Sequence, residues 1–392
     1  MSPHSAILPE PDAAALAHSQ LLLGHVQAII RANGGPISFR QFMQEVLYAP
    51  GLGYYTAGSH KFGAAGDFIT APEISTLFSH TLAQALAPVL PMLDTANILE
   101  VGAGRGVMAA EILRHLERQD SLPEHYYILE LSADLRERQQ ATLAQQLPHL
   151  LERVVWLEQL PQAFSGVVLA NEVLDAMPVN LFTIRGGQVR ERYIDWQDGH
   201  LVWCEGEPSD ERIGVRISAI EQALGQPLAE GYSSEINLLA EDWLATLGQH
   251  LQQGLVLLID YGFPRHEYYH PQRQAGTLMC HYRHHAHDDP FQYLGLQDIT
   301  AHVDFTAMAE AAHTAGLQIC GYTNQGNFLI GSGLAELVGV SEDMSEQVRL
   351  AGEIKKLTMP HEMGELFKVI GLCKGLDIRL PGFAVRDLRN SL

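Results

Sequence analysis

The stretch Ile98-Leu99-Glu100-Val101-Gly102-Ala103-Gly104-Arg105-Gly106 decides the fold, because a short apolar strand runs directly into a glycine-rich turn. A helix is predicted to follow over residues 107–119, which gives a strand, a loop and a helix in succession. Glycines let a backbone approach a ligand closely, and such loops lie at the carboxyl edge of a parallel sheet. The stretch therefore predicts an α/β sheet with a ligand-binding edge.

Strands and helices alternate on both sides of residues 181–250. Helices are predicted over 133–146 and 305–315, and apolar runs predict strands over 126–131, 153–157, 166–170, 255–260, 317–322 and 367–374. This alternation is typical of βαβ units and of a doubly wound parallel sheet. Residues 181–206 differ, because they alternate in polarity around Gly186-Gly187 and Asp198-Gly199 and so predict antiparallel hairpins.

The predicted organisation has two parts. Residues 1–94 are expected to form an N-terminal helical lobe, with Ser38 capping its second helix. Residues 95–392 are expected to form the α/β core, with a β-hairpin and helical insertion at 181–250.

Charge and cysteine usage limit the class of protein. The chain carries 25 basic and 46 acidic side chains, a net charge of −21, which disfavours nucleic acid and favours a basic protein segment as partner. The four cysteines are far apart and indicate a reducing compartment. The first twenty residues lack the pattern of a leader, and no apolar run reaches the length of a membrane span. We expect a cytoplasmic protein without membrane insertion; its oligomeric state stays open.

The glycine spacing favours a cationic cofactor. The loop places glycines at 102, 104 and 106, whereas the dinucleotide fingerprint has its third glycine one residue later. Glu100 enters the loop and can offset the positive charge of S-adenosyl-L-methionine, which carries no phosphate. Glu130 ends the next strand, where an acid can bind both ribose hydroxyls. A nicotinamide cofactor would use Glu130 in the same way, so this acid alone does not distinguish the two.

A second candidate group follows the strand at 166–170. Asn171, Glu172 and Asp175 come where that strand ends beside the expected cofactor crevice. Two carboxylates can hold a guanidinium in a fork and orient one of its nitrogens towards a methyl donor. We therefore predict these three as catalytic residues, with Glu172 able to take the departing proton. Helix capping by Glu172 or Asp175 is the alternative.

Several motifs together resemble the MidA-type methyltransferases, a group that includes the mitochondrial complex I assembly methyltransferase. The resemblance spans about residues 35 to 375. It is carried by the segments 53–55, 66–75, 100–106, 129–132, 170–178, 259–262, 298–305 and 364–374. The segments 66–75 and 170–178 are far more specific than the glycine loop.

This resemblance implies a class I methyltransferase fold, S-adenosyl-L-methionine as cofactor, and arginine methylation of a respiratory-complex subunit. It also implies that the lobe at 1–94 is a lid that closes over the cofactor, with Asp67 and Glu73 contacting the cofactor from it. Two positions depart from the family pattern. Arg105 stands where a small or hydroxyl residue is usual, and Leu294 stands where proline is usual. The first departure could alter cofactor packing, and the second concerns a loop.

Other functions stay open at this stage. The chain could methylate a small metabolite, act as a cofactor-binding assembly chaperone without turnover, or be a nicotinamide-dependent oxidoreductase. His281 and His285 would share a face of a helix and could bind a metal, but Gly276 and Pro290 bracket the segment. We predict no metal site.

Overall fold

The computed structural model describes residues 8–58, 70–338 and 343–392. The chain divides into two compact units, which we call the hairpin unit and the sheet unit. The hairpin unit comprises Met1–Phe68, Asp175–Glu241 and Phe263–Asp304. The sheet unit comprises Ile69–Leu174, Asp242–Gly262 and Phe305–Leu392. Each unit is therefore built from segments far apart in the sequence.

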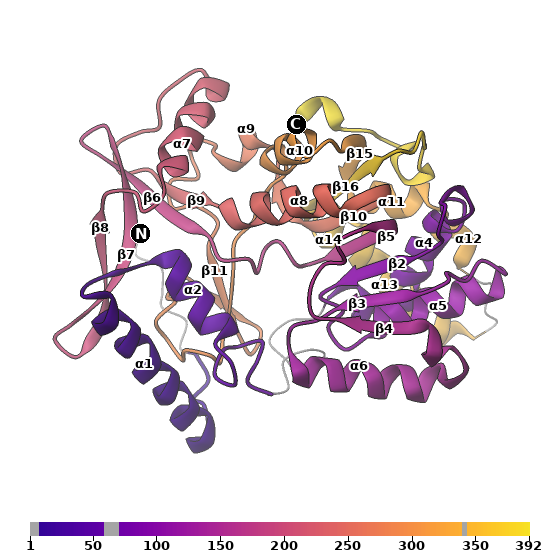
Figure 1. Cartoon of the computed structure of the whole chain (residues 1–392), viewed down its shortest axis with the longest axis horizontal. Helices are drawn as coiled ribbons and strands as arrows, with labels where there is room; N and C mark the ends of the chain where they lie inside the picture. Colours follow the sequence, from indigo (N-terminus) through magenta and orange to yellow (C-terminus); the bar gives the residue numbers. More distant parts are fainter. Residues whose placement is uncertain (1–7, 59–69, 339–342) are drawn as a thin grey trace. The chain divides into compact units, whose positions relative to one another are not determined.

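The sheet unit contains a path of seven strands in the order β15-β16-β10-β5-β2-β3-β4 (Figure 1). The strands are β2 (Ile98–Val101), β3 (Tyr126–Leu129), β4 (Val154–Leu157), β5 (Phe164–Asn171), β10 (Leu251–Phe263), β15 (Gln318–Asn324) and β16 (Phe367–Lys374). Neighbours from β4 to β10 run parallel, and β16 runs antiparallel to both β10 and β15. The predicted doubly wound α/β fold is confirmed.

Strand order reverses beside β2, because β3 and β4 extend the sheet on one side and β5 and β10 on the other. Such a reversal opens a crevice outside the carboxyl ends of the strands, where ligands bind in open α/β sheets. The strands here are almost continuous apolar runs, and all four residues of β2 are buried. That pattern is expected of strands covered on both faces by helices.

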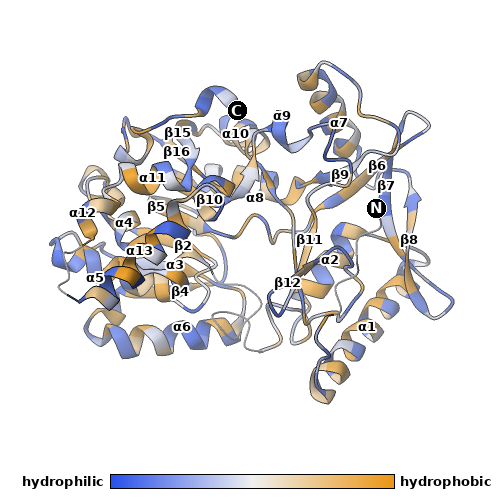
Figure 2. Ribbon diagram, turned by 180° about the vertical axis from the view of Figure 1, so that it is seen from behind, coloured by the Kyte–Doolittle hydropathy of each residue, from blue (hydrophilic) through white to orange (hydrophobic). Residues whose placement is uncertain are grey.

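Helices of the sheet unit follow the predicted alternation. They are α3 (Ala71–Ile74), α4 (Thr76–Leu86), α5 (Val107–Arg118), α6 (Ala133–Gln146), α10 (Phe305–Thr314), α11 (Gln325–Gly331), α12 (Leu334–Leu337), α13 (Met344–Thr358) and α14 (Met363–Leu366), with 3-10 turns at Leu90–Met92, Pro148–Arg153, Pro381–Phe383 and Arg389–Ser391. Ser132 caps α6 through the amide of Leu135, and α6 is largely hydrophilic (Figure 2). Its buried residues are Leu135, Gln139 and Leu143, which lie on one face.

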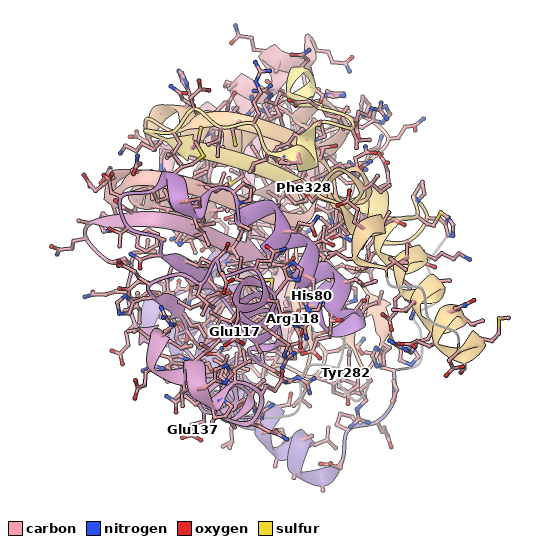
Figure 3. All side chains as sticks on the ribbon, turned by 90° about the vertical axis from the view of Figure 1, so that its right-hand side faces the viewer. His80, Glu117, Arg118, Glu137, Tyr282 and Phe328 are labelled. Atoms are coloured by element: carbon pink, nitrogen blue, oxygen red, sulfur yellow. The ribbon has the colours of Figure 1, made fainter. Side chains whose placement is uncertain are left out.

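Helix α4 packs against α5 inside the sheet unit. Phe78 and Leu82 of α4 lie in the same buried cluster as Ile112 and Leu116 of α5. A polar contact accompanies this packing, because His80, labelled in Figure 3, stacks on His115 with ring centroids 5.1 Å apart. Burying side chains of this size contributes about 1.5–3 kcal/mol each, so α4 is held by the core of the sheet unit.

The hairpin unit contains two antiparallel sheets. One consists of β1 (Ile37–Ser38), β6 (Asn180–Arg185), β7 (Gln188–Gln197), β8 (His200–Gly206) and β9 (Ser233–Ile236). The other consists of β11 (Met279–Tyr282), β12 (His285–His287) and β13 (Asp298–Thr300); the short strand β14 covers Val303–Asp304. The predicted hairpins are present, since β7 pairs antiparallel with both β6 and β8.

The helices of the hairpin unit cover these sheets. They are α1 (Ala13–Asn33), α2 (Phe39–Tyr48), α7 (Glu211–Leu224) and α9 (Arg265–Tyr268), while α8 (Leu238–His250) crosses the division between the units. Ser38 accepts a hydrogen bond from the amide of Gln41 and so caps α2 as predicted. Ile213, Ile217 and Ile220 of α7 are buried in one cluster with residues of β6 and β9.

By length and composition, α1 is the one described helix that could cross a membrane. In the structure Leu22, Val26 and Ile30 of this helix are buried in a core cluster of the hairpin unit.

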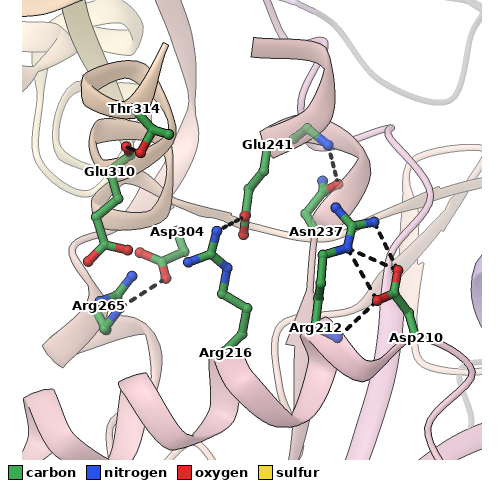
Figure 4. A network of polar contacts seen from close by, with 10 residues as sticks. Asp210, Arg212, Arg216, Asn237, Glu241, Arg265, Asp304, Glu310 and Thr314 are labelled. Carbon is green, nitrogen blue, oxygen red and sulfur yellow. Dashed lines mark hydrogen bonds and ion pairs between the residues drawn. The ribbon is translucent and has the colours of Figure 1, made fainter. Parts of the chain in front are cut away.

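Ion pairs hold the segments around α7 together (Figure 4). Arg212 pairs with Asp210 at the start of α7, at 2.9 Å. One turn later Arg216 pairs with Glu241. Both Arg216 and Arg212 lie on α7, so the helix is tied to its own start and to the segment that carries Glu241.

The compact units differ from the lobes expected in residues 1–94 and 95–392. The reason is non-local packing: α1 and α2 share a core cluster with the hairpins, whereas α4 packs on α5. The segment with His281 and His285 also differs from the helix considered for it. It forms the hairpin of β11 and β12, in which Tyr282 is paired with His285.

Candidate functional site

The candidate site lies at the carboxyl ends of four neighbouring strands of the sheet unit. In the sheet, Val101 at the end of β2 is paired with Leu129 of β3 on one side and Ala170 of β5 on the other. Asn171 is paired with Ile259 of β10. The glycine loop, Glu130 and the segment from Asn171 therefore leave the sheet at one edge.

All three loop glycines adopt left-handed backbone conformations. The φ angles are 66° at Gly102, 52° at Gly104 and 80° at Gly106. A Cβ atom on Gly102 would lie 3.1 Å from the Val173 side chain, and one on Gly106 would lie 3.2 Å from the Gln139 Cα. A Cβ atom on Gly104 would meet nothing within 4 Å. Protein atoms therefore pack closely against the loop at Gly102 and Gly106, whereas the space beside Gly104 is open. A loop that approaches a ligand requires such a space.

Glu130 lies directly after β3 with its carboxylate buried. Its Oε1 accepts a hydrogen bond from the Ser132 amide at 2.9 Å, and its Oε2 accepts one from Gln139 Nε2 at 2.9 Å. Burial raises the pKa of Glu130, while these hydrogen bonds oppose the rise. Each carboxylate oxygen has a further lone pair, so the group can still accept hydrogen bonds from two ribose hydroxyls.

Gln139 of α6 connects the loop to this acid. Its Nε2 donates to the Gly104 carbonyl at 3.0 Å as well as to Glu130, and its Oε1 accepts from Trp156 Nε1 at 3.0 Å. The side chain is fully buried, so leaving any of these groups unpaired would be costly. Sequence reasoning missed Gln139; the available signal was an amide on the apolar face of an otherwise hydrophilic helix.

Glu100 is buried more deeply than expected for a cofactor contact. Its side chain is 1% exposed, and its Oε2 accepts a hydrogen bond from the Tyr126 hydroxyl at 2.6 Å. Burial raises the pKa of Glu100 to about 7, against the lowering effect of the Tyr126 hydrogen bond. The structure therefore gives Glu100 a partner inside the sheet, while its predicted role towards the cofactor stays a prediction.

Arg105 and Glu73 form a bidentate ion pair beside the glycine loop. Arg105 Nε donates to Glu73 Oε1 at 2.9 Å, and a second guanidinium N–H donates to the other oxygen. The Glu73 side chain is 12% exposed, and its pairing raises the pKa of Arg105. The departure from the family pattern at Arg105 thus has a structural partner in Glu73. Asp67, also predicted to contact the cofactor, lies outside the described residues.

Strand β5 ends at Asn171, and the next residue, Glu172, has an unusual backbone conformation. Glu172 has a φ of 54°, a strained value for a residue with a side chain. Its Oε1 accepts hydrogen bonds from Asn171 Nδ2 at 3.1 Å and from the Ala71 amide at 3.4 Å. The Oδ1 atom of Asn171 is buried and has no hydrogen-bond partner among the described residues. A buried acceptor of this kind at a strand end is available to a ligand.

Asp260, close to the end of β10 at Phe263, orients this segment. Its Oδ2 accepts hydrogen bonds from the amides of Val173 and Leu174 at 3.2 and 2.9 Å, and the Glu172 amide donates to the Ile259 carbonyl. The chain after Asn171 is thereby turned away from β5. Sequence reasoning identified the strand that ends at Asp260 but gave this acid no role.

Asp175 begins the second segment of the hairpin unit and has its own surroundings there. Its side chain is 5% exposed, and its backbone carbonyl accepts a hydrogen bond from the Ala301 amide at 3.0 Å. Burial raises the pKa of the Tyr55 hydroxyl, and the charges of Asp298 and Asp175 raise it further. Tyr55 donates to Asp298 at 2.8 Å. The structure therefore gathers Asn171 and Glu172 in the sheet unit, and the role of Asp175 stays a prediction.

The chain matches known methyltransferases in sequence. Residues 81–323 match the model of the family described as "Putative S-adenosyl-L-methionine-dependent methyltransferase". The protein arginine methyltransferase NDUFAF7 homolog, mitochondrial, of Drosophila melanogaster is 30% identical and aligns with 94% of this chain and 88% of its own length. The mitochondrial NDUFAF7 of Mus musculus is 28% identical and aligns with 90% of this chain and 84% of its own length.

A solved structure agrees with these matches. A COG1565 superfamily member of Burkholderia thailandensis, bound to S-adenosyl-homocysteine, is 43% identical with a TM-score of 0.93. The alignment covers 98% of this chain and all of that one. The prediction of S-adenosyl-L-methionine as cofactor is confirmed, and the nicotinamide alternative is wrong. The residues that fit this cofactor here are the open glycine loop and the buried carboxylate of Glu130.

The prediction of a cytoplasmic location is wrong. The curated relatives that match over most of the chain are named as mitochondrial proteins. The prediction depended on the composition of the first twenty residues. A leader is removed once it has directed import, so that composition does not define the compartment of the folded protein.

Replacing Glu100 by Gln should make stability less dependent on pH. The folded pKa of Glu100, about 7, lies above its ordinary value of 4.5, so the folded state keeps a proton that the unfolded chain releases. This contribution is fully present below pH 4.5 and is lost as pH rises through 7. As pH rises across that window, the wild type should lose about 3 kcal/mol in free energy of unfolding relative to Glu100→Gln. Urea denaturation at several pH values measures this difference. Glu137→Gln, on the exposed face of α6, is the control, and its free energy of unfolding should differ from that of the wild type by the same amount at every pH. The same pH-independent difference for Glu100→Gln would contradict the prediction.

Replacing Gln139 by Met should weaken cofactor binding about tenfold or more. The variant keeps the volume of the side chain but removes the donor shared by Gly104 and Glu130, so the loop and the acid lose their common support. Isothermal titration with S-adenosyl-homocysteine measures the effect. The neighbouring Gln140→Met, at an exposed position, is the matched control, and equal affinities in the two variants would refute the role assigned to Gln139.

Proposed function

Because the chain belongs to the family of S-adenosyl-L-methionine-dependent methyltransferases, we propose that it methylates an arginine side chain of a protein substrate. The observation that carries the proposal is the geometry at the end of β5. There a carboxylate, Glu172, is held in a strained backbone conformation beside Asn171. Strain of this kind persists where the surrounding structure fixes it, which is common at reaction centres.

Glu172 supplies what an arginine acceptor needs. A guanidinium is planar and cationic, and a carboxylate binds it through two parallel N–H···O hydrogen bonds. The carboxylate of Glu172 is oriented by Asn171 and by the Ala71 amide, so an arriving guanidinium meets an acceptor whose direction is already set. The unpartnered Asn171 Oδ1 offers a second acceptor beside it.

The bound cofactor supplies a methyl group on a positively charged sulfur. The residues of this chain align the acceptor nitrogen and compensate charge, and alignment of this kind accounts for a large share of the acceleration in such transfers. As the new C–N bond forms, the bond between the methyl group and sulfur would break with its electron pair left on sulfur, and the nitrogen must lose a proton. Glu172 is the group we assign to take it, since its carboxylate is the oriented base at this edge of the sheet.

A protein substrate with a basic segment is consistent with the charge of the chain. The net charge of −21 attracts cationic partners and raises their rate of encounter. The curated relatives are named protein arginine methyltransferases. A subunit of the respiratory NADH dehydrogenase is the substrate that the family resemblance implies.

Mass spectrometry tests the substrate class. The respiratory NADH dehydrogenase is purified from cells with and without this enzyme, and its subunits are searched for methylated arginine. We expect one arginine whose methylation disappears in the deletion and returns when the gene is restored. Unchanged subunits, together with transfer to a small metabolite in extracts, would refute the proposal.

Replacing Glu172 by Gln should abolish transfer while preserving cofactor binding. Gln keeps the size of the side chain but can neither balance the guanidinium charge nor take its proton, so we expect kcat to fall about 100-fold or more. Affinity for S-adenosyl-homocysteine should stay within about threefold of the wild type. The assay follows methyl transfer to the substrate subunit, with Glu158→Gln at an exposed position as control. Full activity in Glu172→Gln would remove this residue from the mechanism.

A further inference from the structure

The hairpin unit contains a cavity that the methyl-transfer site does not use. Its volume is about 240 Å³, and it is enclosed by β6, β7, β8 and β9 with the segment 275–288. The walls include apolar side chains, Leu181, Phe182 and Leu278. Three charged side chains also line it: Arg192 from β7, Glu235 from β9 and Asp288. A cavity with apolar walls and a few polar groups is the usual form of a small-molecule site.

Arg192 is the feature of this cavity that indicates a ligand. Its guanidinium lies over the Trp203 ring, 3.9 Å from the centroid, and is held there by the cation–π contact. Burial lowers the pKa of Arg192, although Glu205 and Glu235 oppose this. Among the residues that the structure describes, none forms a hydrogen bond or an ion pair with this guanidinium. Stacking on Trp203 thus orients the guanidinium, and its N–H groups have no hydrogen-bond acceptor among the described residues.

The two nearby carboxylates are engaged elsewhere. Glu205, paired with Arg192 across β7 and β8, binds the guanidinium of Arg185 at 2.9 to 3.1 Å. Glu235 Oε1 accepts hydrogen bonds from the amides of Thr277 and Leu278 at 2.9 and 3.0 Å. Neither carboxylate therefore forms an ion pair with Arg192, which leaves a half-buried cation facing the cavity.

We propose that this cavity binds a small organic acid, with its carboxylate on Arg192 and its apolar body against Leu181, Phe182 and Leu278. A planar guanidinium with free N–H groups matches a carboxylate in two parallel hydrogen bonds. The volume equals roughly eight water molecules at about 30 Å³ each, which suits a ligand of leucine size. Asp288 at an exposed position on the lining can attract an ammonium group on the same ligand, so an amino acid fits both charges.

Three ligands with one shared body test the proposal by isothermal titration against the full chain. Leucine carries both charges, 4-methylpentanoate carries the carboxylate alone, and 3-methylbutylamine carries the ammonium alone. We expect leucine and 4-methylpentanoate to bind at concentrations up to about 10 mM, and the amine not to bind. Gly-Gly-Leu and its amide, added separately, distinguish a free acid from the carboxyl end of a peptide.

Variants at Arg192 assign the binding to this cavity. Arg192→Met keeps the side-chain stem over Trp203 and should weaken both carboxylate ligands about tenfold or more. Arg192→Lys keeps the charge without the planar fork and should show an intermediate loss. Arg190→Met, on the same strand and paired with Glu207, is the matched control and should bind as the wild type does.

Several results would overturn the proposal. They are the absence of carboxylate binding to the wild type, equal binding in Arg192→Met, or binding of the amine as tight as that of 4-methylpentanoate. Thermal unfolding of each variant, measured without ligand, separates lost binding from lost folding. The proposal stands apart from the methyltransferase activity, because its readout is binding to the hairpin unit and requires no cofactor.

Discussion

The side-chain amide of Gln139 is the contact on which the candidate site depends. It joins three separate segments through three hydrogen bonds: the glycine loop after β2, the acid after β3, and Trp156 of β4. Because the amide is fully buried, water cannot replace any of these partners. The loop and the acid are therefore positioned together, and Gly106 must lack a side chain because α6 comes so close at Gln139.

Much of the sheet unit was predictable because its signals are local. Strands such as 367–374 are short apolar runs bounded by turn residues, and the helix at 133–146 begins at a serine cap. Two kinds of feature escaped prediction. The helix α13 is mostly exposed, with Leu357 as its buried residue, so no apolar run marks it. The hairpin at 279–287 was obscured by histidines whose spacing also suits a helix. The grouping of α1 and α2 with the hairpins depends on contacts between segments far apart in sequence.

The candidate site shows the same division. Glycines 102, 104 and 106 and the acid at 130 were recognisable, because backbone approach and strand ends impose residue types. Their partners were not recognisable, because hydrogen bonds such as those from Tyr126 to Glu100 and from Arg105 to Glu73 join positions on different elements. Arg105 illustrates the point: as a departure from the family pattern it looked disruptive, yet the fold supplies a carboxylate that engages its guanidinium in two hydrogen bonds.

The position of β16 has a consequence for how the chain is made. This strand lies near the end of the sequence but is inserted between β10 and β15, and it pairs with β10 along Gly254–Tyr261. Until residue 374 has left the ribosome, β10 and β15 present unpaired backbone edges to the cell. Exposed apolar edges of this kind recruit other chains. The growing polypeptide must therefore be shielded from neighbours late in translation, and a message cut short before this strand would yield an aggregating product.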